Sequence, residues 1–205
     1  MAAMPLPSRV SPFGELSASP ARGTLMGNRG GQIHDAQRKL GPRRWSSRQW
    51  ICCVLDFNGR HREVWSGGSY TELFFLDEVT AFAAGHRPCF ECRRKDAEHF
   101  AALFSGKAKR ASAPAMDLVL HAERLDGKEK RLHRRDIDEL PDGAVIARDG
   151  EAFAVRGKQL LQWTARGYNA MQPRPRAIEA GVLTPPSMVK VLEAGYRPRW
   201  HSSAG

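Results

Sequence analysis

The chain has 205 residues, of which 41% are apolar, and it carries a formal net charge of +10. It is long enough to bury a core as one domain or two small ones. Nothing in it approaches the ~18–20 consecutive apolar residues of a membrane span. The first residues lack the pattern of a secretory signal, and four cysteines are few for a disulfide scaffold. We therefore expect a cytoplasmic protein with no membrane contact.

The positive charge is concentrated at the two ends of the chain. Residues 1–50 hold 8 basic and 2 acidic side chains, and residues 151–205 hold 8 and 3. Arginine predominates, and the guanidinium group matches the geometry of phosphate. We expect contact with nucleic acid, either DNA or RNA, although a merely solubilising basic surface remains an alternative.

The N-terminal quarter predicts a tail followed by a β-hairpin. Residues 1–25 are rich in Pro, Ser and Ala without periodicity, which indicates disorder. Strands over 50–57 and 60–65 are predicted to pair through Asn58-Gly59, a preferred type I′ turn. Neighbouring side chains on a strand point to opposite faces. At most one of the adjacent cysteines on the first strand is therefore expected to enter any single site.

Two helices are predicted after this hairpin. The first lies between Asp77, as its N-cap, and Gly85, which ends it in the left-handed conformation. The second covers residues 93–104 and has an apolar stripe at helical spacing. The stripe consists of Ala97, Phe100, Ala101 and Phe104.

The second half predicts a linker over 106–116 and then a separate region, 117–205. Asp117 is expected to cap a short helix, and the run AVIARDGEAFAVRGKQLLQW predicts three antiparallel strands. A terminal helix is predicted between Thr184, as its cap, and Gly195. The fold class is therefore α+β: a hairpin and CxxC-helix module over 26–105, then a small antiparallel β-meander with a C-terminal helix.

The stretch AGHRPCFECRR, residues 84–94, holds the most informative motif of the chain. The bend of a CxxC pair lets two thiolates bind one Zn²⁺. A following helix would favour the thiolate form through its positive N-terminal end. Cys89 and Cys92 are therefore predicted to bind zinc, and we expect the zinc to be structural. A metal-free pair packed in the core and a redox pair remain the alternatives.

The longer stretch FFLDEVTAFAAGHRPCFECRR resembles the second half of the zinc-binding module of Ada-type DNA repair proteins. The resemblance covers about 20 residues and implies that Cys89 and Cys92 are zinc ligands; the remainder resembles a bacterial protein family. The first half of that module usually supplies a second, spaced ligand pair. This chain offers only the adjacent Cys52 and Cys53, so the methyl-accepting chemistry of the repair proteins is not expected. A complete site would need one or both of these cysteines, and a histidine can join them; the candidates are His34, His86 and His99.

Two enzyme classes are weaker alternatives. Zinc deaminases combine H-x-E with P-C-x-x-C, and His61, Arg62 and Glu63 precede the CxxC pair. However, Asn58-Gly59 predicts a strand here, whereas deamination needs a helix. A metal-dependent nuclease would need a convergent set from a charged segment: His121, Glu123, His133, Asp136 and Asp138. We assign no catalytic residue and favour a non-enzyme.

Basic side chains near the CxxC pair and in the loop at 41–49 are the predicted nucleic-acid contacts. They are Arg43, Arg44, Arg87, Arg93 and Arg94. A metal-free domain that uses its basic surface to bind another protein is the remaining alternative.

Overall fold

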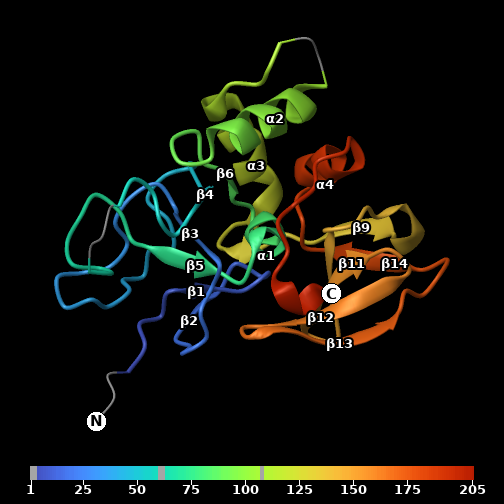
Figure 1. Cartoon of the computed structure of the whole chain (residues 1–205), viewed down its shortest axis with the longest axis horizontal. Coiled ribbons are helices and arrows are strands. Elements are labelled where there is room, and N and C mark those ends of the chain that lie inside the picture. The colour runs from blue at the N-terminus through green and yellow to red at the C-terminus, as the bar shows by residue number, and fades with distance from the viewer. Residues whose placement is uncertain (1–3, 60–62, 107–108) are drawn as a thin grey trace.

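Two six-stranded sheets lie on either side of one short helix, α1 (Glu78–Ala83), in the computed structural model (Figure 1). The structure describes residues 4–59, 63–106 and 109–205. Helices and largely antiparallel strands are both present, which confirms the predicted α+β class. Within these ranges, no helix is both long and apolar enough to cross a bilayer.

The first sheet has the strand order β2-β1-β5-β3-β4-β6. Its strands are β1 (Arg9–Val10), β2 (Leu16–Ser17), β3 (Leu25–Asn28), β4 (Ile51–Cys53), β5 (Leu73–Phe75) and β6 (Arg87–Pro88). Most neighbours are antiparallel, but β1 runs parallel to β5 and β4 runs parallel to β6. The sheet therefore joins segments that are far apart in sequence.

Two predictions about this region are wrong. Residues 9–17 form β1 and β2 rather than part of a disordered tail, because Val10 is buried in the core beside Leu25. The pair expected at Asn58-Gly59 does not form either, since β4 pairs with β3 and β6. Residues 60–62 of that expected hairpin lie outside the described part of the chain.

Helix α1 is the element that both sheets share. All six of its residues are buried. Val79 and Ala83 pack with the second sheet, whereas Ala81 packs with the first. As predicted, Asp77 caps the helix by accepting a hydrogen bond from Thr80 N (2.9 Å), and Gly85 ends it with φ +86°. Helix α1 thus connects the apolar clusters of the two halves on either side of residues 106–116.

The second sheet has the order β13-β12-β11-β10-β14-β9. Its strands are β9 (His133–Asp136), β10 (Val145–Arg148), β11 (Glu151–Arg156), β12 (Gln159–Thr164), β13 (Gly167–Pro173) and β14 (Glu179–Val182). The predicted meander is confirmed in β10, β11 and β12, which pair in antiparallel succession. A short 3-10 helix, η1 (Ile137–Glu139), follows β9, and a small pair, β7 (Leu125–Asp126) and β8 (Glu129–Lys130), precedes it.

Three longer helices cover the end of α1 in one layer: α2 (Arg94–Ser105), α3 (Ala113–Arg124) and α4 (Pro186–Glu193) (Figure 1). The predicted apolar stripe of α2 is confirmed, since Ala97, Phe100 and Ala101 are buried. Two predicted caps are wrong. Helix α3 begins earlier, at a cap formed by Ser112, so its first turn occupies the expected linker. The hydroxyl of Thr184 accepts from Val145 N (2.9 Å) instead of capping α4.

The C-terminal segment is anchored on the two acidic residues at the start of α1. Glu78 accepts hydrogen bonds from Arg199 N and from the Tyr196 hydroxyl, both at 2.9 Å. Asp77 accepts from His201 N (3.1 Å), and a 3-10 helix, η2 (Ser202–Ala204), follows. The backbone of this segment is therefore fixed to α1, whereas the side chains of Arg197 and Arg199 remain exposed.

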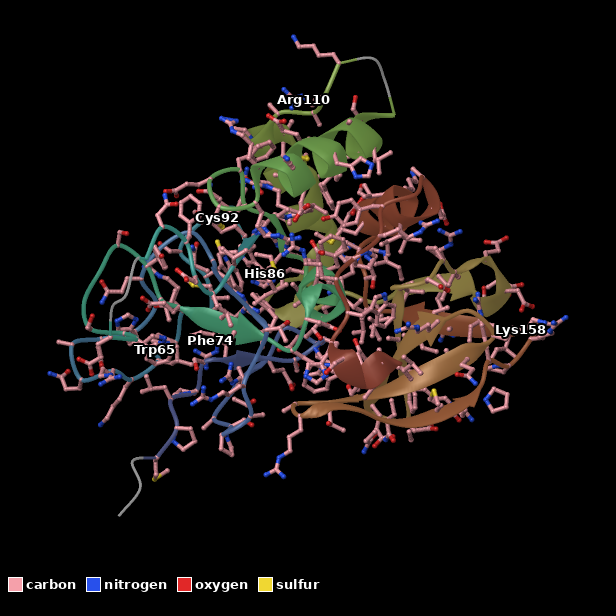
Figure 2. The ribbon with its side chains drawn as sticks, viewed as in Figure 1. Trp65, Phe74, His86, Cys92, Arg110 and Lys158 are labelled. Carbon is pink, nitrogen blue, oxygen red and sulfur yellow. The ribbon has the colours of Figure 1, made fainter. Side chains whose placement is uncertain are left out.

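A group of buried cations lies between β3, β4 and the end of α3. The guanidinium carbons of Arg29 and Arg124 lie 4.0 and 4.1 Å from the centre of the Trp50 ring. Arg29 Nε donates to His86 Nε2 (3.3 Å), and His86 lies inside the molecule (Figure 2). Arg124 donates to the backbone oxygens of Gly85 and Arg48. The ring faces and backbone oxygens thus replace carboxylates as partners of these charges.

Lys130 is half-buried, donates from Nζ to Ala83 O and feels the charges of Arg124 and Arg29, which gives a pH-dependent prediction. Burial, followed by the charges of Arg124 and Arg29, lowers the pKa of Lys130 to about 7. An unfolded lysine keeps its proton up to about pH 10. Between pH 7 and 10 the unfolded chain therefore binds more protons, and this residue makes the free energy of unfolding rise with pH, by up to about 1.4 kcal/mol per unit.

We expect Lys130→Met to flatten this rise, as measured by urea unfolding at pH 7, 8 and 9. Lys190→Met is the matched control because Lys190 is exposed on α4. If both variants kept the slope of the unaltered protein, the altered titration of Lys130 would be ruled out.

Candidate metal centre

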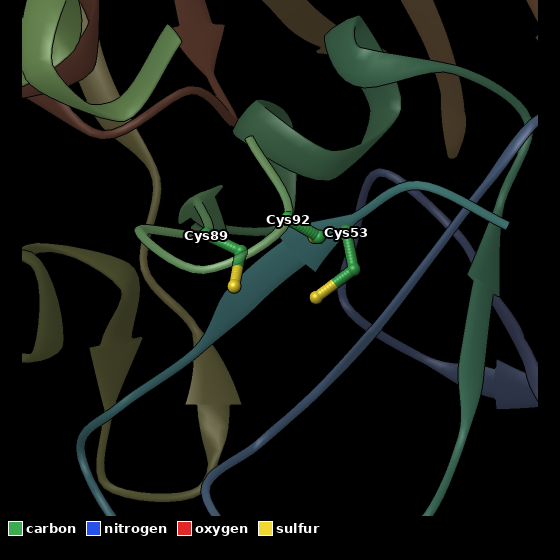
Figure 3. Close-up of side chains that lie close together, drawn as sticks. All are labelled: Cys53, Cys89 and Cys92. Atoms are coloured by element: carbon green, nitrogen blue, oxygen red, sulfur yellow. The ribbon is translucent and has the colours of Figure 1, made fainter. Parts of the chain in front are cut away.

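Three of the four cysteines converge on one point. The sulfurs of Cys53, Cys89 and Cys92 all lie within 4.8 Å of one another. Cys53 comes from β4, whereas Cys89 and Cys92 come from the loop that leads into α2 (Figure 3). Two segments about 35 residues apart thus build a single cluster, which lies on the first-sheet side of the molecule (Figure 2).

The parallel pairing of β4 with β6 creates this cluster. Cys52 is paired with Pro88, and Cys89 N donates to Cys52 O at 3.0 Å. The CxxC turn therefore begins directly beside the end of β4, where Cys53 lies. Arg93 N then donates to Cys89 O (3.0 Å), which closes the turn immediately before α2.

Hydrogen bonds bias the cluster toward one ionised sulfur. The thiols of Cys53 and Cys92, helped by the backbone, lower the pKa of Cys89 to about 2. One of the backbone donors is Glu91 N, 3.4 Å from Cys89 Sγ. The same thiol contacts, together with burial, raise the pKa of Cys53. A dication that replaced the shared protons would allow all three sulfurs to be thiolates.

The spacing and the donor set fit zinc. Four sulfurs around Zn²⁺ at about 2.3 Å would lie about 3.8 Å apart, and the three sulfurs are already within 4.8 Å. Thiolate ligands select Zn²⁺ and other soft ions over Mg²⁺ and Ca²⁺. In the described ranges, no His, Asp or Glu joins this group.

Cys52 is not part of the cluster, which corrects its predicted role as a ligand. It is fully buried among Leu73, Phe75 and other core residues, and its sulfur accepts a long hydrogen bond from Arg93 Nη1 (3.6 Å). Burial raises the pKa of this thiol. Because side chains alternate along β4, placing Cys53 in the cluster directs Cys52 into the core.

The histidines considered as further ligands have other partners. His34 stacks on Trp65 with ring centres 5.0 Å apart. His86 accepts from Arg29, and His99 packs against Tyr196. None of the three joins the described sulfur cluster.

Two of the five arginines predicted to contact nucleic acid are buried. The side chains of Arg87 and Arg93 are each 1% exposed. Arg87 forms a two-pronged ion pair with Asp117, and Arg93 pairs with Glu78 and Asp96. The prediction for these two residues is therefore wrong. Arg43, Arg44 and Arg94 are exposed.

The residues of the rival enzyme motifs do not build a site in the described parts of the chain. His61 and Arg62 lie outside those parts, and Glu63 forms an exposed ion pair with Arg38 at 2.6 Å. Glu123, from the nuclease-like segment, accepts two hydrogen bonds from Ser187. No cluster of potential metal ligands other than the three cysteines was found there.

A cavity of about 560 Å³, which no pattern in the sequence predicts, adjoins the cluster. All three clustered cysteines line it, together with residues from β3, β5 and the chain between 54 and 72. The apolar residues at 54–57 were assigned to a strand, although they line this cavity instead. The sequence signals them only through the length of the apolar run 50–57, which extends beyond the end of β4 at Cys53.

Fold and site together define an α+β protein with a three-thiol cluster that is compatible with a metal ion. A comparison with family models found no match, and neither curated proteins nor solved structures yielded one.

Proposed function

We propose that the protein binds one Zn²⁺ ion through Cys53, Cys89 and Cys92. The main support for this proposal is that three sulfurs from two distant segments of the chain lie within 4.8 Å of one another. The ion would tie the end of β4 to the loop before α2. Its binding would therefore contribute directly to folding, because the unfolded chain holds no such site.

Metal analysis tests this proposal. Purified, reduced protein should contain about one zinc per chain, measured by elemental analysis, and removal by a strong chelator should lower the thermal midpoint. Cys89→Ser and Cys92→Ser should each lower the affinity for zinc at least tenfold, and so lower the zinc content, because losing only a hydrogen-bond partner of a metal ligand already costs about 10- to 100-fold.

Cys52→Ala is the matched control, because it removes the neighbouring thiol without touching the cluster. It should keep its zinc even if it loses stability. Zinc-free native protein that a chelator leaves unaltered would refute the proposal, as would zinc loss in Cys52→Ala alone.

We also propose that the loop at 41–49 contacts nucleic acid. Arg43, Arg44 and Arg48 are exposed on it, and none of them forms an ion pair with another described residue. Trp45 lies between them, half-buried against Trp50 and His121. Exposed arginines around an aromatic ring suit phosphates and an unstacked base.

Binding to DNA and RNA oligonucleotides should weaken steeply as salt rises, because phosphate contacts release counterions. Replacing Arg43 and Arg44 with Ala should reduce the slope of log K against log salt by about two. A control with Arg131 and Arg148 replaced loses the same charge from the other half of the chain. Equal loss in both double variants would indicate nonspecific attraction and contradict the assignment.

A further inference from the structure

Two buried arginines fix the backbone of the basic loop at 41–49. Arg29 Nη1 donates to Arg44 O at 3.3 Å, and Arg124 Nη2 donates to Arg48 O at 2.6 Å. The two donors come from distant parts of the chain, so the loop is tied to the core at two points. A surface whose backbone is fixed in advance loses less conformational entropy when it binds a partner.

Positive charge gathers in this loop and beneath it. The segment GPRRWSSRQ, residues 41–49, holds three arginines and no acidic residue. Arg29 and Arg124 are buried below it, where burial lowers the pKa of each to about 9 and still leaves both charged at pH 7. Such a concentration of one sign of charge attracts phosphate groups.

Two aromatic side chains meet in the same region. Trp45 comes from the loop and His121 from α3, and their ring centres are 5.8 Å apart with 71° between the ring planes. Both residues are half-buried, so each keeps part of its surface in contact with solvent. An edge-on contact uses only one ring face of the pair, so a further flat group can stack on another.

Arg124 determines which nitrogen of His121 carries the proton. Arg124 Nη2 lies 3.1 Å from His121 Nδ1, and because a guanidinium group can only donate, Nδ1 accepts. Burial, followed by the charges of Arg124 and Arg48, lowers the pKa of His121, so the ring is neutral at pH 7. Its single ring proton therefore lies on Nε2, which makes this atom a hydrogen-bond donor in the ring beside Trp45.

We propose that Trp45 and His121 bind an unpaired base of a single-stranded nucleic acid. Trp45 stacks on the base, and His121 Nε2 donates a hydrogen bond to a ring nitrogen or carbonyl oxygen at the base edge. Arg43, Arg44 and Arg48 bind the neighbouring phosphates. A duplex keeps its bases stacked on one another, so a single strand is preferred. This inference rests on the proposed contact of the loop with nucleic acid.

Three labelled probes of equal length separate base contacts from phosphate contacts: an oligothymidylate of about 12 nucleotides, its duplex with oligoadenylate, and an abasic strand. Fluorescence anisotropy at one salt concentration measures their binding. The oligothymidylate should bind at least about tenfold more tightly than the abasic strand, and also more tightly than the duplex, because only its bases can stack on Trp45. Equal binding of all three would overturn this inference and leave the phosphate contacts intact. Failure of all three to bind would refute the proposed contact and this inference together.

Trp45→Leu tests the stacking without removing a charge. It should weaken binding of the oligothymidylate about 5- to 100-fold, while the abasic strand and the slope of log K against log salt stay unaltered. Trp200→Leu is the matched control, because Trp200 is also half-buried and lies beside an arginine, Arg156. Thermal unfolding checks that both variants are folded. Equal loss in the two variants, or an equal loss for the abasic strand, would overturn the stacking contact.

His121→Phe and His121→Gln test the hydrogen bond to the base. Phenylalanine keeps a ring beside Trp45 but has no donor, whereas the amide of glutamine retains one. The first variant should weaken binding of the oligothymidylate about 2- to 10-fold, and the second should stay within about twofold of the unaltered protein. If His121→Phe lost no affinity, or His121→Gln lost as much as His121→Phe, His121 would not be the donor to the base.

Discussion

Glu78→Gln is expected to lower the free energy of unfolding by about 3 to 5 kcal/mol, the usual cost of breaking a buried ion pair. Glu78 is fully buried at the start of α1, and its carboxylate lies 2.6 Å from Arg93 Nη2. Tyr196 and Arg199 also donate to it. The amide of glutamine keeps the shape of the carboxylate. However, its NH₂ group replaces one acceptor oxygen and would face groups that also donate hydrogen bonds.

Urea unfolding at pH 7 measures this loss. Glu98→Gln is the matched control, because Glu98 pairs with Arg94 and Arg110 at the surface of α2. Exposed pairs of this kind contribute about 0 to 1 kcal/mol. Equal destabilisation by the two substitutions would show that the buried carboxylate has no special role.

Trp50→Leu is expected to cost about 3 to 5 kcal/mol, because it combines a large core truncation with lost cation–π attraction. Trp50 is 2% exposed, and two guanidinium groups lie over its ring. Leucine has no aromatic ring, so the buried guanidinium groups of Arg29 and Arg124 would lose the electron-rich faces of the indole that they now contact. The hydrogen bond from Trp50 Nε1 to Ser47 O (3.2 Å) would also be lost.

Trp50→Phe keeps a smaller ring in place and should cost about half as much. Trp200→Leu is a second comparison, because Trp200 is half-buried and, among the described residues, a single guanidinium group, that of Arg156, lies over its ring at 5.1 Å. Denaturant unfolding of the three variants should rank Trp50→Leu as the least stable. If Trp50→Leu were no less stable than Trp200→Leu, the buried cations would not depend on the indole.

Local patterns predicted the parts of this fold that are formed by neighbours in sequence. Asp77 and Gly85 mark the ends of α1 as expected, and the glycine turns at 149–150 and 157–158 join β10, β11 and β12. The CxxC bend likewise precedes a helix, as predicted. Each of these features depends on backbone preferences within a few residues.

Local sequence patterns could not predict the contacts between segments that are far apart in the chain. The pairing of β4 with β6 decides which cysteine meets the CxxC pair, and no local signal specifies it. Arg87 and Arg93 appear as surface charges in the sequence because their partners, Asp117 and Glu78, lie 30 and 15 residues away. Buried arginine is rare unless it is paired, so the linear pattern favoured the wrong interpretation. The candidate site was thus predictable in its CxxC half, whereas Cys53 and the cavity required the tertiary structure.

The central position of α1 has a consequence for how the molecule melts. Its six residues contact both sheets and the layer of longer helices at once. Loosening either side would expose this segment to water and withdraw support from the other side. Heat should therefore disrupt the entire chain in a single cooperative step, and an ion that binds beside β4 should also protect the distant meander.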